Sequence, residues 1–252
     1  MDEPSVTGSP KIELIKPDWN APPNVRAFST TRHRGFSKGP WSSLNLGGSC
    51  GDNPEHVKEN RELLQRMLPG KPPWLKQVHG KHVVGWNEAS QSTREADAVF
   101  TSGTGQVCAV LTADCLPVLF CDKAGTRVAA AHAGWRGLAA GVLEATVAAM
   151  DCDPAELMAW MGPAIGPQAF EVGRDVYDAF VGLDADNSTA FKVSADRWLA
   201  DLYALARMAL VRAGVGWVLD GQYCTYSEPN KFFSYRREAV TGRMATGIWL
   251  KA

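Results

Sequence analysis

The chain has 252 residues, of which 45% are hydrophobic and 21% are charged, and its formal net charge is -1. This composition is ordinary for a soluble globular protein, and the balanced charge excludes the strongly basic surface that tracks nucleic-acid phosphates. No apolar run reaches the roughly 20 residues that cross a bilayer, and the acidic N-terminus is unlike a secretory signal. Six cysteines without a Cys-x-x-Cys pair favour a reduced cytoplasmic protein.

The N-terminal part of the chain divides into a tail and the start of one domain. Residues 1–24 are rich in proline and lack periodicity, which predicts a mobile N-terminal segment. Residues 25–252 are expected to form a single domain, because no later Pro/Ser/Gly linker is long enough to divide them. Residues 25–53 indicate a strand and a long Gly/Ser-rich loop, and such ordered loops are often functional. A helix over residues 55–68 follows.

Strands and helices then mix without strict alternation. Short apolar runs predict strands over residues 98–101, 107–112, 117–121, 127–131, 157–161, 215–219 and 245–250. Apolar repeats and small-residue runs predict helices over residues 138–150, 175–181 and 196–213. This order favours an α+β sandwich over a doubly wound parallel sheet.

Three candidate metal ligands, His79, Cys115 and His132, stand at or near the ends of strand-like runs. A thiolate and two imidazoles form a three-ligand transition-metal site, and a zinc ion with three protein ligands keeps its fourth position open for catalysis. Alternatively, Cys115 is a nucleophile with a histidine as its base. Each residue by itself also fits a structural role, as a hydrogen-bonded histidine or a packed cysteine.

Charged residues beside these ligands are candidates for further roles. Asp114 directly precedes Cys115, where it either accepts a hydrogen bond from a metal-bound imidazole or caps the following turn. Arg136 follows His132 at an expected strand-to-helix junction, so it is either part of a phosphate site or an ordinary surface arginine. Arg236 is a second candidate for anion binding.

An ordered series of motifs covers nearly the whole chain. It includes Ser29-Thr-Thr-Arg32, Asn60-Arg61, Gln77-Val-His79, Thr112-Ala-Asp-Cys115, His132-Ala-Gly-Trp-Arg136 and Phe233-Ser-Tyr-Arg236. This series resembles the laccase-domain family, also called the YfiH-like or polyphenol-oxidase family, whose members are regarded as purine nucleoside phosphorylases.

The resemblance implies a fold, a metal and a reaction. The fold is a four-layer α/β/β/α sandwich with mixed sheets, and the metal is zinc bound by His79, Cys115 and His132, with copper as the alternative. The reaction is phosphorolysis of adenosine, inosine and S-methyl-5'-thioadenosine to free base and ribose 1-phosphate, with adenosine deamination as a side activity. A multicopper oxidase centre is not expected, because the chain has five histidines and no His-x-His pair.

Roles in catalysis follow from these expectations. Asp114 is the expected general acid or base, beside the three metal ligands. The residues expected to contact nucleoside or phosphate are Asn45, Arg61, Gln77, Arg136 and Arg236. We expect a monomer or weak homodimer whose partners are these small molecules. Two alternatives stay open: a hydrolase that edits peptidoglycan precursors as an amidase, and a non-enzymatic zinc-binding interaction module.

Overall fold

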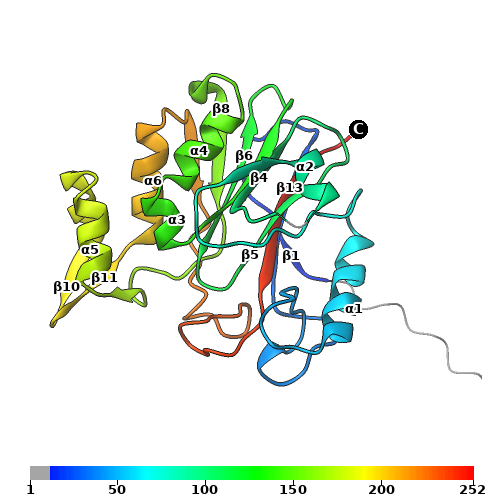
Figure 1. Cartoon of the computed structure of the whole chain (residues 1–252), viewed down its shortest axis with the longest axis horizontal. Helices are drawn as coiled ribbons and strands as arrows, with labels where there is room; N and C mark the ends of the chain where they lie inside the picture. Colours follow the sequence, from blue (N-terminus) through cyan, green and yellow to red (C-terminus); the bar gives the residue numbers. More distant parts are fainter. Residues whose placement is uncertain (1–11, 93) are drawn as a thin grey trace, which may run out of the picture.

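Two β-sheets stacked face to face form the centre of the computed structural model, which describes residues 12–92 and 94–252 (Figure 1). The larger sheet has six strands in the order β12-β8-β6-β7-β4-β3, and the smaller has four in the order β1-β2-β13-β5. The strands of the larger sheet are β3 Val83–Gly85, β4 Ala98–Thr101, β6 Leu116–Asp122, β7 Val128–Ala133, β8 Leu157–Met161 and β12 Trp217–Asp220. Those of the smaller sheet are β1 Leu14–Ile15, β2 Val25–Thr30, β5 Cys108–Thr112 and β13 Met244–Leu250.

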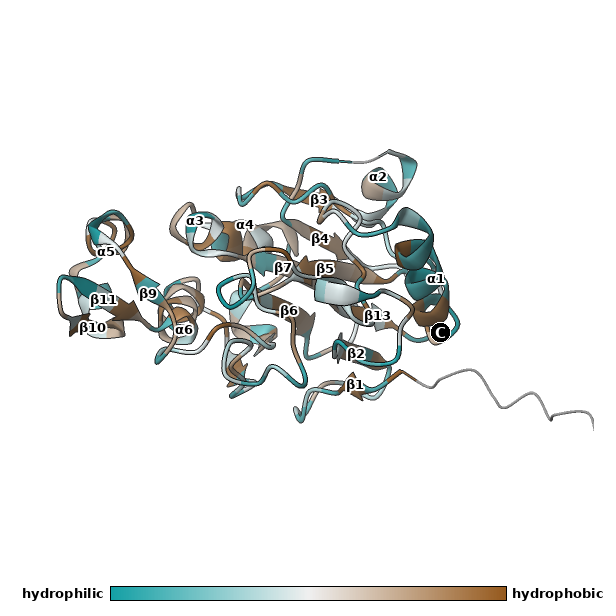
Figure 2. Cartoon of the chain, turned by 90° about the horizontal axis from the view of Figure 1, so that it is seen from below, coloured by the Kyte–Doolittle hydropathy of each residue, from teal (hydrophilic) through white to brown (hydrophobic). Residues whose placement is uncertain are grey.

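The larger sheet is mixed, because β12 runs parallel to β8 and β3 parallel to β4 while the other pairs are antiparallel. Every residue of β6 and β7 is buried. Both faces of this sheet are covered, which explains why its central strands are continuous apolar runs in the sequence. In Figure 2 strands of this sheet such as β4 and β6 accordingly carry the brown of hydrophobic residues.

Three hydrophobic clusters hold the layers together, one between the two sheets and one on the outer face of each sheet. Between the sheets, Val110 and Ile248 of the smaller sheet pack with residues of the larger sheet such as Leu119. Helices cover the outer faces: α1 Pro54–Gln65, α3 Trp135–Ala139, α4 Val142–Ala149 and α6 Leu202–Arg212. The last three pack on the larger sheet, and α1 packs on the smaller one. The predicted four-layer α/β/β/α sandwich with mixed sheets is therefore confirmed.

A small unit packs beside α3 and α6 at one side of these layers, at the left of Figure 1. It is a three-stranded antiparallel sheet in the order β10-β11-β9, with a helix beside it. Its elements are β9 Glu171–Val172, α5 Arg174–Val181, η3 Ala185–Ala190, β10 Phe191–Ser194 and β11 Arg197–Ala200. The remaining short helices of the described chain are η1 Gly39–Trp41, α2 Trp86–Gln91 and η2 Pro154–Glu156.

Three predicted helices differ in their bounds from the structure, and the one expected over residues 55–68 ends at Gln65. The helix expected over residues 138–150 is divided into α3 and α4 at Gly141, whose left-handed backbone, with φ 91°, interrupts the helix. The helix expected over 196–213 is wrong in its first part, where residues 197–200 pair with β10 as a strand. The helix begins only after Asp201, whose side chain accepts a hydrogen bond from Ala204 N as an N-cap.

The segment predicted to be mobile, residues 1–24, is described only in part. Positions 1–11 lie outside the described residues. Leu14–Ile15 pairs antiparallel with β2, and Ile12 is buried with the core of the smaller sheet. Among the described residues, no helix combines the length and the apolar character needed to cross a membrane.

Candidate metal centre

His79, Cys115 and His132 meet in space. Each offers one ligand atom, and these atoms all lie within 4.8 Å of one another. Cys115 Sγ lies 3.7 Å from His79 Nε2, and the two imidazole rings meet edge to face with centroids 4.8 Å apart. A tetrahedral zinc ion would hold a sulfur and a nitrogen ligand about 3.6 Å apart. The three side chains therefore fit around a single metal ion.

The sheets bring these residues together from three parts of the chain. Cys115 lies in the turn between β5 and β6, and His132 lies in β7 opposite Pro117 of β6. His79 belongs to the loop before β3 and has a left-handed backbone, with φ 60°. His132 is only 3% exposed, whereas His79 is exposed. The cluster is thus rooted in the larger sheet and open to solvent on the side of His79.

Gly134, just after β7, provides room for the cluster. A Cβ atom at this position would lie 2.8 Å from His79 Cδ2 and 2.9 Å from Cys115 Sγ. The φ of Gly134 is -62°, which any residue adopts. The glycine is therefore required by the closeness of the two side chains and not by the backbone conformation.

Asp97 is a buried carboxylate beside the cluster. It is fully buried, and its Oδ1 accepts a hydrogen bond from His132 Nδ1 at 2.8 Å. The sequence patterns alone assigned no role to Asp97. The available signal was an acidic residue directly before the apolar strand 98–101, since an acidic residue next to a buried strand needs a partner.

The charges of the cluster are coupled. Burial by itself would raise the pKa of the Cys115 thiol, but the neighbouring His132 and His79 lower it to about 6. Burial by itself would lower the pKa of His132, but Cys115 and Asp97 raise it to about 9. Without a metal, the pair is therefore a thiolate and an imidazolium at neutral pH. A thiolate is the form in which cysteine binds a metal or attacks a substrate.

The carboxylate of Asp114 is hydrogen-bonded to groups other than the imidazoles of His79 and His132. Its Oδ1 accepts a hydrogen bond from Thr225 Oγ1 and its Oδ2 accepts one from Arg236 N, both at 2.6 Å. The carboxylate that accepts from His132 is Asp97. Asp114 thus joins the turn before Cys115 to the loop that precedes β13, and its part in proton transfer stays a prediction.

Three of the residues predicted to contact substrate are bonded to the protein backbone. The side chain of Asn45 is fully buried and accepts hydrogen bonds from Gly47 N and Arg243 N. Arg61 Nε donates to Leu46 O. Gln77 bonds both the N–H and the carbonyl of Leu111 in β5. These contacts shape the long loop and the edge of the smaller sheet, and contacts of the three residues with substrate stay predictions.

The two arginines predicted to bind phosphate differ in how they are held. Arg236 donates from Nη1 to Glu171 O at 2.7 Å and lies over the ring of Phe170. Arg136 is exposed, and its guanidinium lies 4.5 Å from the ring centroid of Trp135. Within residues 12–92 and 94–252, no carboxylate pairs with Arg136. Of the two, Arg136 is the one whose guanidinium makes no hydrogen bond to the described residues.

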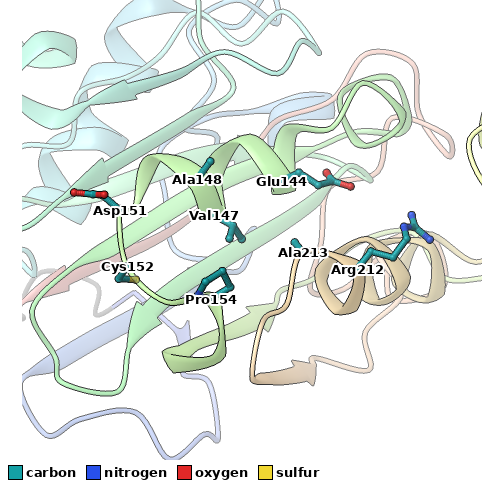
Figure 3. A pocket seen from close by; sticks show the side chains of 8 residues that line it. All are labelled: Glu144, Val147, Ala148, Asp151, Cys152, Pro154, Arg212 and Ala213. Atoms are coloured by element: carbon teal, nitrogen blue, oxygen red, sulfur yellow. The ribbon is translucent and has the colours of Figure 1, made fainter.

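Two hollows lie elsewhere, on the helical layer over the larger sheet. The first, about 530 Å³, lies between α4 and α6 (Figure 3). The second, about 890 Å³, is lined by residues of α3 to α6 and by the segment 81–83. Glu144 and Arg212 line both, and neither is lined by His79, Cys115 or His132.

The sequence is similar to known proteins over nearly its whole length. Residues 26–251 match the family described as multi-copper polyphenol oxidoreductase laccase. Purine nucleoside phosphorylase YfiH of Escherichia coli is 55% identical over 240 residues, which cover 94% of this chain and 99% of that protein. Purine nucleoside phosphorylase PA4543 of Pseudomonas aeruginosa is 53% identical over 240 residues, covering 94% of this chain and 98% of that protein.

Solved structures agree with this similarity. The crystal structure of Neisseria meningitidis protein NMB0706 is 54% identical and superposes with a TM-score of 0.92, covering 95% of this chain and 99% of that one. YlmD from Geobacillus stearothermophilus is 29% identical with a TM-score of 0.88, covering 96% of this chain and 100% of that one. Sequence and fold therefore point to the same group of proteins.

Proposed function

This chain belongs to the family described as multi-copper polyphenol oxidoreductase laccase, and on that premise we propose that it is a zinc-dependent purine nucleoside phosphorylase. Its proposed substrates are phosphate with adenosine, inosine or S-methyl-5'-thioadenosine, and its products are the free base and ribose 1-phosphate or the methylthio analogue. The strongest support is the 55% identity, over 94% of the chain, with the Escherichia coli protein of that name. The His-Cys-His cluster, which could hold a metal ion, also supports the proposal.

Zinc suits the cluster better than a multicopper oxidase centre does. Of the five histidines in the sequence, His33, His56 and His82 lie outside the cluster, so few imidazoles are left for further copper ions. Thiolate sulfur and imidazole nitrogen are donors that zinc binds, and three protein ligands leave its fourth position open. When bound, zinc would act as a Lewis acid and lower the pKa of a water in its open position to about 7.

The chain's own residues would bind phosphate and move protons. Breaking the glycosidic bond builds positive charge on the ribose, which an adjacent phosphate dianion stabilises before it bonds to C1′. Arg136, four positions after His132, is exposed and has no carboxylate partner in the described chain, so it can bind this dianion. Asp114, the neighbour of Cys115 in the chain, is our candidate for proton transfer, and Thr225 and the backbone of Arg236 hold its carboxylate in place.

The phosphorylase proposal is tested by the dependence of product formation on phosphate. Adenine release from adenosine should require phosphate and yield ribose 1-phosphate, as followed by chromatography of the products. Arg136→Ala should raise the phosphate KM about 10- to 100-fold, because a hydrogen bond to a charged group contributes about 1.5–3 kcal/mol. Zinc content, measured by elemental analysis, should stay unchanged.

Arg174→Ala is the matched control. Arg174 is also exposed and lies near aromatic rings, those of Tyr177 and Trp198, but it belongs to the outlying α5 unit. Its loss should leave the phosphate KM unchanged. Equal adenine release with and without phosphate, with free ribose in both, would show that the enzyme is a hydrolase.

Deamination of adenosine to inosine is proposed as a side activity of the same site. It requires attack of an activated water on the purine C6, which is chemistry that zinc supports in other deaminases. Removal of the metal by a chelator should therefore abolish inosine formation, and returned zinc should restore it. Inosine formation at an unchanged rate in the metal-free protein would contradict this assignment.

A cysteine-type hydrolase is the second candidate function. The contact of 3.7 Å between Cys115 Sγ and His79 Nε2, together with the lowered pKa of the thiol, would suit a nucleophile with its base. Mass spectrometry of the metal-free protein after incubation with a peptidoglycan precursor separates the two functions. A covalent acyl adduct on Cys115 would favour the hydrolase.

A further inference from the structure

We propose that Asp97 is the positioning residue of the metal centre, and that its one carboxylate sets the orientation of both histidine ligands. Each of its two carboxylate oxygens accepts two hydrogen bonds. Oδ1 accepts hydrogen bonds from His132 Nδ1 at 2.8 Å and from His79 N at 3.0 Å. Oδ2 accepts from Gly80 N at 2.7 Å and from Val78 N at 3.3 Å. This inference rests on the metal-binding role proposed for the cluster.

The carboxylate is itself placed by the larger sheet. Asp97 directly precedes β4, which pairs parallel with β3 and antiparallel with β7. Its backbone N–H donates to His82 O at 3.0 Å, and its carbonyl accepts from His132 N at 2.7 Å. Backbone and side chain of Asp97 therefore both bridge the loop of His79 and the strand of His132. A group held on two sides by a sheet is rigid enough to orient ligands.

For His132, the hydrogen bond decides which nitrogen faces the metal. In the neutral imidazole that binds a metal, Nδ1 donates its proton to Asp97, so Nε2 is the nitrogen left with a lone pair. Metal-bound histidines in proteins commonly have such a carboxylate partner, which fixes both the tautomer and the ring orientation. Because His132 and Asp97 are both buried, water cannot take the place of this partner.

For His79, the carboxylate stabilises an otherwise unfavourable loop. The backbone of His79 is left-handed, with φ 60°, a conformation that residues other than glycine rarely adopt. Three successive backbone N–H groups, those of residues 78, 79 and 80, converge on Asp97. Such a concave arrangement of N–H groups binds an anion. The negative charge of Asp97 thus holds the turn that aims the His79 ring at Cys115.

The variant Asp97→Asn changes the hydrogen bonds of this side chain while keeping its size. Its amide has the shape of the carboxylate, but only one oxygen can accept hydrogen bonds. If that oxygen stays with Gly80 and Val78, the NH₂ group faces His132 Nδ1 and forces the imidazole to turn its lone pair away from the metal. If the amide rotates, the loop of His79 loses its acceptor instead. Either arrangement disturbs one of the two histidine ligands.

We expect Asp97→Asn to weaken zinc binding about 10- to 100-fold, the usual effect of losing such a hydrogen-bond partner. Zinc affinity is measured by competition with a chelating dye, on protein whose fold is verified by circular dichroism. Cobalt(II) replaces zinc in a second measurement, because its visible absorption reports the geometry of the ligands. The spectrum should change in the variant, which a loss of stability alone would not produce.

Asp122→Asn is the matched control. Asp122 is 5% exposed and accepts hydrogen bonds from Thr126 N, Thr126 Oγ1 and Arg127 N, but it lies at the far end of β6. This control should keep the zinc affinity and cobalt spectrum of the unchanged protein. Zinc affinity and a cobalt spectrum in Asp97→Asn equal to those of the unchanged protein would overturn the inference.

A measurement on the unchanged protein covers the case in which Asp97→Asn does not fold. In the metal-free protein the amide protons of Val78, His79 and Gly80 should exchange with solvent much more slowly than those of an exposed loop. Exchange at the rate of a free loop would refute the role of Asp97. These readouts are independent of catalysis, so absence of phosphorolysis overturns the proposed function alone, whereas absence of zinc binding by the unchanged protein overturns both.

Discussion

At Cys115, opposite effects act on one thiol, and their balance decides the chemistry. Burial favours the neutral thiol, while the imidazoles of His79 and His132 favour the thiolate. The net result is a pKa of about 6 for Cys115 and about 9 for His132 in the metal-free cluster. The Cys115 thiolate therefore stabilises the metal-free fold, and this contribution is lost as pH falls through about 6. The contribution of the His132 imidazolium is lost as pH rises through about 9.

The pH dependence of alkylation tests this balance. In metal-free protein, the rate at which iodoacetamide modifies Cys115 should reach half its maximum near pH 6, because the thiolate is the reactive form. Peptide mapping by mass spectrometry follows each cysteine separately. Cys152, whose pKa burial raises, is the internal control and should react only at higher pH. A midpoint for Cys115 near 8.5, the value of a free cysteine, would mean that the imidazoles do not stabilise the thiolate.

Gly134→Ala tests whether the space over the cluster is needed. The added methyl group would lie 2.8 Å from His79 Cδ2 and 2.9 Å from Cys115 Sγ, so one of the two must move away from the metal. We expect a folded protein whose zinc affinity, measured by dye competition, falls at least about 10-fold, as when a ligand loses its orientation. Gly85→Ala is the control, because its Cβ would meet only Phe100, at 3.9 Å. Unchanged zinc affinity in Gly134→Ala would place the ligands further apart than the structure does.

At the scale of elements, α6 supports the loops around the cluster through one hydroxyl group. Tyr203, in the first turn of α6, is 9% exposed, and its hydroxyl accepts a hydrogen bond from Ala164 N at 2.9 Å. It also lies within hydrogen-bond distance of the carbonyls of Gly162 and Tyr223. Ile165, which follows Ala164 in the chain, donates its backbone N–H to the carbonyl oxygen of Asp114. A helix on the outer face is thus connected to the turn before Cys115.

Tyr203→Phe removes this connection. It should lower the free energy of unfolding by about 1–3 kcal/mol, because Ala164 N–H and the two carbonyls then lose a buried partner. Urea denaturation followed by circular dichroism measures the change. Tyr177→Phe is the control, since the contacts of Tyr177 with Phe191 and Trp198 are made by its ring. Equal stabilities of the two variants would show that the hydroxyl of Tyr203 contributes nothing.

At the scale of the whole molecule, the C-terminal strand lies inside the smaller sheet. β13 pairs antiparallel with β2 on one side and with β5 on the other, so Thr246 lies between Ser29 and Val110. The last strand of the chain therefore joins one of the first to one from the middle. Its inner face, with Ile248 and Leu250, belongs to the core between the two sheets.

Removal of residues 244–252 should prevent folding, although these residues include no metal ligand. The deletion would leave the N–H and carbonyl groups of β2 and β5 without partners and expose the core between the sheets. Circular dichroism during heating should show no cooperative transition, and gel filtration should show an expanded or aggregated chain. Removal of Ala252 alone, which is exposed, should leave a normal transition. A cooperative transition in the longer deletion would contradict this view of β13.

The sequence by itself determined which donor groups the candidate site contains and the class of the fold. Thiol and imidazole side chains at the ends of apolar runs indicate a metal centre because ligand type depends only on residue type. The buried strands were predicted to within a residue or two, since continuous apolar runs are read locally. Local patterns failed where strand pairing overrides helix propensity, as in residues 197–200, which pair with the neighbouring β10 and with β9.

Only the tertiary structure decided which side chains meet. His79, Cys115 and His132 are far apart in the chain, and the order of strands in the larger sheet brings them together. The same strand order places Asp97 against His132 and turns Asp114 toward Thr225, although Asp114 is the direct neighbour of Cys115 in sequence. The direction of a side chain depends on strand pairing and backbone conformation, as with the φ of 85° at Asp114. Proximity along the chain carries no information about either.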